Sequence, residues 1–267
     1  MDRTRVTKKR VKTSEDKSQK PNTSLRLNQI TPLTSVQSAF FNVYNEYDVL
    51  SLTGSPGTGK SFLALFKALE DFEAGEQYQK IVIVRSSVSG RAMGFLPGSS
   101  KEKMEVFEAP YISIVNELYG RGDAYSILKN KGIIEFISSS FLRGTTWNNM
   151  IVIVDECQNM SYQELSTILT RFGSNCKLVL CGDVNQDDLT SERYNETSGY
   201  AKILEILQGV KRAYSLTFGV DDIVRSGFVK DFIIAANRYE KRAKRSLNRQ
   251  GNDQIIVTSL QLLDPVA

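Results

Sequence analysis

The sequence predicts an α/β protein built on a mostly parallel β-sheet with helices on both faces. Short apolar runs of the buried-strand type alternate along the chain with longer segments of helical character. Strands that alternate with helices join most simply as βαβ units, so we expect the strands to be parallel and covered on both sides. At 267 residues and 41% hydrophobic, the chain can bury one substantial core. We therefore expect one domain with tails.

The first segments lead into this domain. Residues 1–24 lack apolar periodicity and are rich in Lys, Ser and Thr, which predicts a basic disordered tail. Residues 25–34 should form an extended lead-in, and 35–44 a helix with Ser35 as a possible N-cap. We expect the domain to span residues 25–245 and a second tail to occupy 246–267.

The most informative stretch is 47–61, where a short apolar strand enters the Gly-rich sequence GSPGTGKS and an apolar helix over 62–72 follows. This is the strand–GxxxxGK[ST]–helix pattern of a phosphate-binding P-loop. Glycines let backbone N–H groups turn toward phosphate oxygens, and the helix N-terminus adds its positive dipole. Lys60 should reach the β- and γ-phosphates, and Ser61 should hold Mg²⁺. We expect a nucleoside triphosphate to contact Gly54, Ser55, Pro56, Gly57, Thr58, Gly59, Lys60, Ser61 and Phe62.

The elements after the P-loop continue the alternation. Gly75 should end the P-loop helix, and the loop over 86–100 is long enough to suggest a function. The helix over 101–119 should be in two pieces, with Pro110 starting the second and Gly120 capping it. Further strands are expected at 81–84, 133–137, 150–154, 178–181 and, more weakly, 213–217. Further helices are expected at 163–171, 201–207 and 227–243, and residues 254–267 could add an edge strand.

Polar residues follow two of the expected strands. The run IVIVDE at 151–156 ends in two carboxylates, and ligands of open α/β sheets bind beyond such strand ends. Asp155 is expected to hold Mg²⁺, and Glu156 to orient and polarise the attacking water. Gln186 follows the strand at 178–181 and could bond the γ-phosphate or the lytic water. An ordinary polar turn is the alternative interpretation of Gln186.

Composition and missing motifs exclude several classes. The chain has no histidine, which excludes His-based acid–base catalysis and leaves too few ligands for a zinc site. The sequence Asn130-Lys131-Gly132 is followed by Ile133 instead of the Asp of guanine readers, and no Arg-rich lid of a small-molecule kinase is found. Three cysteines are expected to be buried thiols. With no apolar run of 18 residues and no signal peptide, we expect a cytoplasmic protein without membrane contact.

An ordered series of motifs resembles a known family. The P-loop is followed by GFLPG at 94–98, KEK at 101–103, FLRGTT at 141–146, DECQN at 155–159, TRFG at 170–173, GDVNQDDL at 182–189, SG at 198–199 and DIVR at 222–225. Over roughly residues 31–239 this series resembles the PhoH-like ATPases, relatives of the first RecA-like domain of superfamily 1 helicases. The resemblance implies a RecA-like fold, ATP hydrolysis with Mg²⁺ and a link to RNA or DNA.

The resemblance also suggests a role for Gln37, and the chain departs from the family's usual residues at Ser86, Trp147, Cys157 and Asn185. The segment 32–37 resembles the stretch in which related helicases read adenine with a Gln, which implies that role for Gln37, and an ordinary surface Gln is the alternative. Ser86 follows Arg85 where the family usually has Pro, which bears on the nucleic-acid contact expected of this loop. Cys157 replaces the usual Ala after the acidic pair, and no catalytic group is lost.

Positive charge gathers at the two ends of the chain. Residues 1–20 carry eight Lys or Arg against three acidic residues, and 238–249 carry six against one, although the net charge is only +4. Basic ends on a mildly acidic body suit RNA or single-stranded DNA, and solvated disordered ends are the alternative. Within the body we expect nucleic acid to contact loop cations, with solvated loop charges as the alternative: Arg85, Arg91, Lys101, Lys103 and Arg143.

The last expectation concerns assembly. Superfamily 1 helicases complete their ATP site with an Arg from a second domain, whereas the motifs here end near Arg225 and too few residues follow for one. Arg171 or Arg225 could serve a neighbouring subunit, in a homo-oligomeric ring such as a hexamer. The alternative is a monomer in which Arg225 completes its own site. The function classes left open are a helicase-like motor, an ATP-gated binding protein with slow hydrolysis, and a metabolite kinase.

Overall fold

The computed structural model describes residues 25–75, 77–86, 100–139, 146–184, 199–236 and 238–239, with only the backbone at 100–103. Both expected tails, most of the loop at 86–100 and the possible strand near the C-terminus lie outside the described residues. The same holds for three predicted site residues, Arg91, Arg143 and Gln186.

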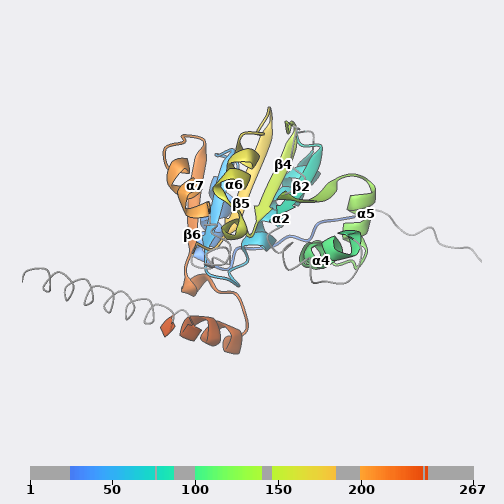
Figure 1. Ribbon diagram of the computed structural model, residues 1–267. Coiled ribbons are helices and arrows are strands. Elements are labelled where there is room, and N and C mark those ends of the chain that lie inside the picture. The colour runs from blue at the N-terminus through green and yellow to red at the C-terminus, as the bar shows by residue number, and fades with distance from the viewer. Residues whose placement is uncertain are drawn as a thin grey trace, which may run out of the picture.

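A six-stranded parallel sheet forms the centre of the molecule (Figure 1). Its strands lie in the order β3-β2-β4-β5-β1-β6, and every pairing is parallel. The predicted α/β fold with a parallel sheet is therefore confirmed. The strand bounds are β1 Val49–Gly54, β2 Lys80–Arg85, β3 Ile134–Ser138, β4 Met150–Asp155, β5 Cys176–Gly182 and β6 Ala213–Phe218.

Each central strand supplies side chains to two separate cores, because successive strand residues point to opposite faces. Ile81, Ile83, Ile151 and Ile153 lie in one core, and the intervening valines of β2 and β4 lie in the other. This explains the continuous apolar runs in the sequence, since both faces of the sheet are buried. The edge strands β3 and β6 are partly exposed, and their sequences are correspondingly mixed.

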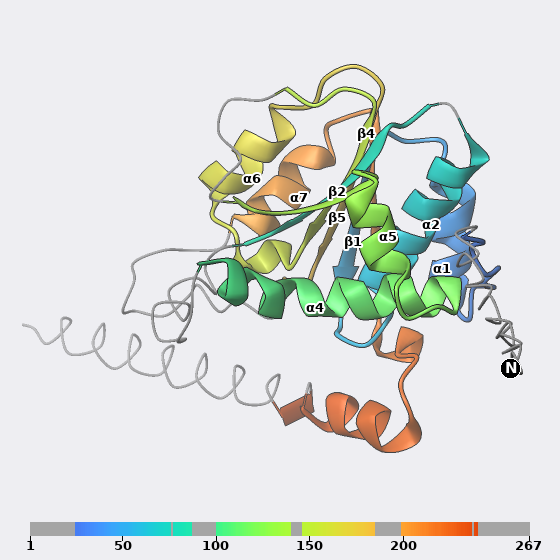
Figure 2. The same cartoon turned by 90° about the vertical axis from the view of Figure 1, so that its right-hand side faces the viewer.

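Helices cover both faces of the sheet (Figure 2). One core includes residues of α1 Ser35–Val43, α2 Lys60–Ala74, α4 Ser100–Tyr119 and α5 Ala124–Asn130. The other includes residues of α6 Tyr162–Leu169 and α7 Tyr200–Leu207. Short 3₁₀ turns, η2 Cys157–Asn159 and η3 Val220–Asp222, follow β4 and β6. Residues 227–236 form a further helix, and α4 runs beneath the carboxyl-terminal edge of the sheet.

Two local predictions need correction, and one short helix was not predicted. The N-cap of α1 is Thr34, whose hydroxyl accepts the N–H of Gln37 at 3.3 Å, so Ser35 is already helical. α4 is one helix instead of two, with Pro110 in its interior. Proline costs that helix one hydrogen bond, but buried side chains on both sides of it, Glu108 and Tyr111, hold the helix against the body. α5 was not predicted, because seven residues are too few to display a helical period.

The remaining expectations concern thiols and membranes. The three cysteines are free and buried, as predicted. None of the helices within the described ranges is long and apolar enough to cross a bilayer.

Candidate functional site

The Gly-rich loop joins β1 to α2 at the carboxyl-terminal edge of the sheet. Gly54, Gly57 and Gly59 all have positive φ, at 123°, 75° and 84°. At Gly54 a Cβ atom would lie 2.0 Å from the carbonyl oxygen of Phe218 on β6. Only glycine permits this backbone approach, so the loop conformation depends on the residue types that the motif specifies.

The Lys60 side chain folds back over the loop. Its ammonium donates to the carbonyl oxygens of Gly54 at 2.6 Å and Ser55 at 2.8 Å. Burial lowers the pKa of Lys60, and nearby Asp155 and Asp183 oppose that shift. A partly desolvated ammonium held inside a P-loop is well suited to neutralise a phosphate.

Two oxygen groups from distant parts of the chain meet beside Lys60. The Ser61 hydroxyl donates to both carboxylate oxygens of Asp155, at 2.9 and 3.0 Å. Tyr111 of α4 donates to Asp155 Oδ2 at 2.9 Å. Hydroxyl and carboxylate oxygens suit Mg²⁺, which takes only one or two protein ligands and completes its shell with water and phosphate.

Glu156 has an unusual backbone and a defined partner. Its φ is 55°, in the left-handed region that is uncommon for a residue with a side chain. Gln158 donates to Glu156 Oε2 at 2.6 Å, and an Arg85 nitrogen lies 4.0 Å from Oε1. Burial and the charge of Asp155 raise the pKa of Glu156. A partly buried carboxylate with a raised pKa at a strand end is typical of a general base.

Gln158 is a site residue that we did not predict. Its amide oxygen accepts the backbone N–H of Asp183 at 3.0 Å, so it links the acidic pair to the end of β5. The DECQN segment contains it, but only its contact with the end of β5 distinguishes it from an ordinary turn residue.

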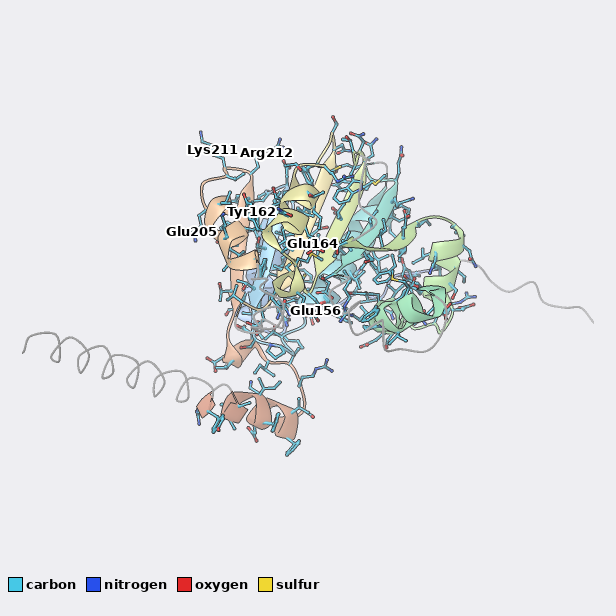
Figure 3. The ribbon with its side chains drawn as sticks, in the orientation of Figure 1. Glu156, Tyr162, Glu164, Glu205, Lys211 and Arg212 are labelled. Atoms are coloured by element: carbon cyan, nitrogen blue, oxygen red, sulfur yellow. The ribbon has the colours of Figure 1, made fainter. Side chains whose placement is uncertain are left out.

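The labelled residues show the two ends of the strands. Glu156 lies at the carboxyl-terminal ends, and Lys211 and Arg212 lie at the opposite, amino-terminal ends (Figure 3).

A cleft of about 760 Å³ opens between the lead-in, the P-loop, α4 and the acidic pair. Gln37 lines it and is 3% exposed, so the interpretation as a surface residue is wrong. Its side chain accepts the N–H of Leu33 at 2.8 Å and donates to the Thr58 carbonyl at 3.2 Å. The cleft also includes Ile30, Leu33, Pro56, Lys60, Ser61, Phe62, Glu156 and Gln158.

The two candidate finger arginines lie in different places. Arg225 is exposed, lines the cleft and packs against Gly57, and the Val224 N–H donates to the Gly57 carbonyl at 3.1 Å. The Arg171 carbonyl accepts the N–H of Trp147, ahead of β4, at 2.9 Å. Arg171 therefore lies near the amino ends of the strands, away from the cleft of its own chain.

Few of the predicted nucleic-acid contacts fall on described side chains. Arg85 ends β2, and it donates to the Phe107 carbonyl at 3.4 Å and lies 5.7 Å from the Phe107 ring centre. Ser86 is buried and donates to the Asn159 carbonyl at 2.5 Å. Lys101 and Lys103 lie in the first turns of α4, where only the backbone is described.

Known proteins resemble this chain over most of its length. The family model described as "PhoH-like protein" matches residues 29–237. A PhoH-like protein of Mycobacterium leprae is 31% identical over 79% of this chain and 60% of its own length. One of Bacillus subtilis is 32% identical over 77% of this chain and 63% of its own. The chain thus spans about 60% of the length of these two relatives.

Solved structures are less similar. A large terminase from a thermophilic bacteriophage has a TM-score of 0.45 at 13% identity, covering 75% of this chain and 49% of its own. The Pif1 helicase of Candida albicans has a TM-score of 0.31 at 20% identity, covering 71% and 40%. These scores are too low to support a conclusion. On the family match, which spans most of the sequence, this chain belongs to the PhoH-like proteins.

Proposed function

We propose that this protein is a Mg²⁺-dependent ATPase that acts on or with RNA or single-stranded DNA. The hydrogen bonds between Ser61 and Asp155 carry the proposal, because they join the P-loop to the acidic strand end across 94 residues of sequence. Lys60 and Glu156, the sequence neighbours of this pair, line the same cleft. A phosphate-binding loop, a cation site and a carboxylate base at one strand edge are the parts that phosphoryl transfer to water requires.

In this proposal each residue has a separate role. The loop N–H groups and Lys60 bind the β- and γ-phosphates, while Ser61 and Asp155 hold the cation. Bound Mg²⁺ would neutralise charge on the phosphates. Glu156 orients the attacking water and accepts its proton. The hydrogen bond from Gln158 holds the Glu156 carboxylate in position for this role. Gln186 is proposed to contact the γ-phosphate or the lytic water.

Recognition of adenine is proposed at the lead-in side of the cleft. Ile30, Leu33 and Phe62 supply apolar surface there, and Gln37 supplies an amide. Both ends of that amide are hydrogen-bonded to backbone groups, so it also links the lead-in to the P-loop. This assignment would be supported if the wild-type protein prefers ATP over GTP and if the Gln37→Ala variant has a smaller preference.

Nucleic acid is proposed to bind along Arg85, Arg91, Lys101, Lys103 and Arg143. Arg85 supports this, because it ends β2, contacts Phe107 of α4 and lies 4.0 Å from Glu156, where a bound polymer could influence hydrolysis. The competing proposal is an ATP-gated binding protein that hydrolyses slowly and does not translocate. Strong stimulation of phosphate release by RNA or single-stranded DNA favours the motor, and an unchanged rate favours the gated binder.

The binding surface is tested by charge reversal. Arg91→Glu with Arg143→Glu should weaken affinity and reduce the slope of log affinity against log salt by about one unit for each phosphate that is no longer neutralised. The matched control is Lys211→Glu, an exposed cation at the opposite edge of the sheet. Equal affinities for the double variant and the control would contradict this surface.

A homo-oligomeric ring, with a hexamer as one form, is proposed for the assembly. Arg171 is the better candidate to reach a neighbour, since it lies away from its own cleft, whereas Arg225 lines that cleft and suits a role within its own chain. Light scattering with Mg²⁺ and ATP tests the ring. A monomer whose specific activity is independent of protein concentration would contradict it.

A further inference from the structure

One side of helix α4 contacts the acidic end of β4. Phe107 and Tyr111 are four residues apart, so they lie on the same face of the helix. Tyr111 bonds Asp155 directly, and the Phe107 carbonyl accepts from Arg85, which lies beside Glu156. In Figure 2, α4 runs across the carboxyl-terminal edge of the sheet. The helix thus contacts Asp155 directly and Glu156 through Arg85.

The Tyr111 contact is buried and has a defined direction. Tyr111 is fully buried, and its ring packs on Phe136 of β3 with the ring centres 5.5 Å apart. The phenol O–H of Tyr111 donates to Asp155 Oδ2 at 2.9 Å, and a carboxylate oxygen can only accept in this contact.

The hydrogen bonds of Asp155 indicate what this donor does. Among the described residues, Oδ2 accepts from Tyr111 and Ser61, whereas Oδ1 accepts from Ser61 only. If the Ser61 hydroxyl turns to a cation, as the proposed function requires, Tyr111 is the donor from α4 that still orients the carboxylate. With Oδ2 held by the phenol, Oδ1 is the oxygen left to face the cation.

We propose that Tyr111 is a positioning residue for the metal site, which holds the Asp155 carboxylate in the orientation that binds a divalent cation. The inference rests on the proposed function, since it assumes that Asp155 serves the cation. In this arrangement the packing of α4 on the sheet sets the affinity of the Asp155 site for the cation. Partners of this kind behind metal ligands commonly contribute 10- to 100-fold in affinity.

The test compares two tyrosines of the same helix. Tyr111→Phe removes the donor to Asp155, and the control Tyr119→Phe removes a donor to Glu73, 2.7 Å away on α2. Mn²⁺ binding to each protein with ADP is measured by electron paramagnetic resonance, so the readout does not depend on turnover. Tyr111→Phe should bind Mn²⁺ about 10-fold more weakly than wild type, and Tyr119→Phe should match wild type. Binding of ADP in EDTA should be equal in all three.

Further arms separate the possible failures. In an Asp155→Ala background Tyr111→Phe should have no added effect on Mn²⁺ affinity, because the two residues act as a pair. Equal Mn²⁺ affinity in Tyr111→Phe and wild type would overturn the inference and leave the proposed function intact. Wild-type protein that binds neither ADP nor Mn²⁺ would contradict the proposed function itself.

A second measurement covers a Tyr111→Phe protein that does not fold. A chain that is otherwise wild type and carries 3-fluorotyrosine at position 111 keeps the ring and the hydroxyl. Its fluorine resonance should shift when Mg²⁺ is added to the ADP complex, whereas the same label at Tyr119 should not respond. An unchanged resonance at position 111 would also overturn the inference.

Discussion

Replacement of Glu156 by Gln tests the proposed base most directly. The side chains are similar in size, and a carbonyl oxygen at position 156 can still accept from Gln158, now at 2.6 Å. The local structure should therefore survive, while the group that accepts the proton is lost. A positioned general base contributes about 10²- to 10⁴-fold. We expect kcat to fall by that factor, a rise in the activation barrier of about 3–5 kcal/mol.

Nucleotide binding should persist in this variant. Glu156 does not contact the P-loop carbonyls that hold Lys60, so the affinity for Mg²⁺ and ATP should stay within about threefold of wild type. The matched control is Glu135→Gln on β3, which removes an exposed carboxylate paired with Lys80 at 2.8 Å. Phosphate release and equilibrium ATP binding are measured for all three proteins. Glu156→Gln turnover within threefold of wild type would refute the assignment of the base.

The pH profile gives the same residue a second signature. Burial and Asp155 raise the pKa of Glu156, so its active ionised form is lost at a higher pH than for an ordinary Glu. Turnover should fall as the pH drops through this raised pKa, which gives the pH profile an acid limb. The Glu135→Gln protein should show the same acid limb. Residual turnover of Glu156→Gln should lack it. An acid limb retained in Glu156→Gln would assign the titration to another group.

Two further substitutions test the P-loop. Lys60→Ala should abolish detectable ATP binding in calorimetry, because it removes the cation that neutralises phosphate, and Lys80→Ala should bind normally. ATP binding retained at wild-type affinity would contradict the P-loop assignment. Gly54→Ala should destabilise the protein by more than about 4 kcal/mol in urea unfolding, since its Cβ would meet the Phe218 oxygen at 2.0 Å. Gly75→Ala has a similar φ but open space, so strain alone should cost about 1–3 kcal/mol. Equal losses of unfolding free energy in the two variants would show that the close approach of the Phe218 oxygen to Gly54 does not contribute.

Much of the site could be predicted because its parts are contiguous in sequence. The GSPGTGKS loop needs glycines at set positions, and the IVIVDE run is buried on both faces through Asp155 and becomes partly exposed only at Glu156. Both patterns express local constraints, namely backbone conformation and strand burial. Periodicity also predicted the alternation of strands and helices, and so the parallel sheet.

The short and composite features could not be predicted in this way. Seven residues of α5 are too few for a period, and Pro110 looked like a helix start because local rules cannot weigh the packing that holds α4 together. The orientation of Gln37 was equally open, since a surface helix and a buried link to the P-loop have the same local sequence.

The sequence by itself determined which groups this protein has for phosphate chemistry and the class of fold that carries them. The tertiary structure decided which of these groups meet. Ser61 contacts Asp155 because β1 and β4 end at the same sheet edge, on either side of β5. Tyr111 reaches that pair from α4, and Arg225, not Arg171, enters the cleft. Such contacts depend on strand order and helix packing, which arise from interactions between distant residues and leave no local pattern.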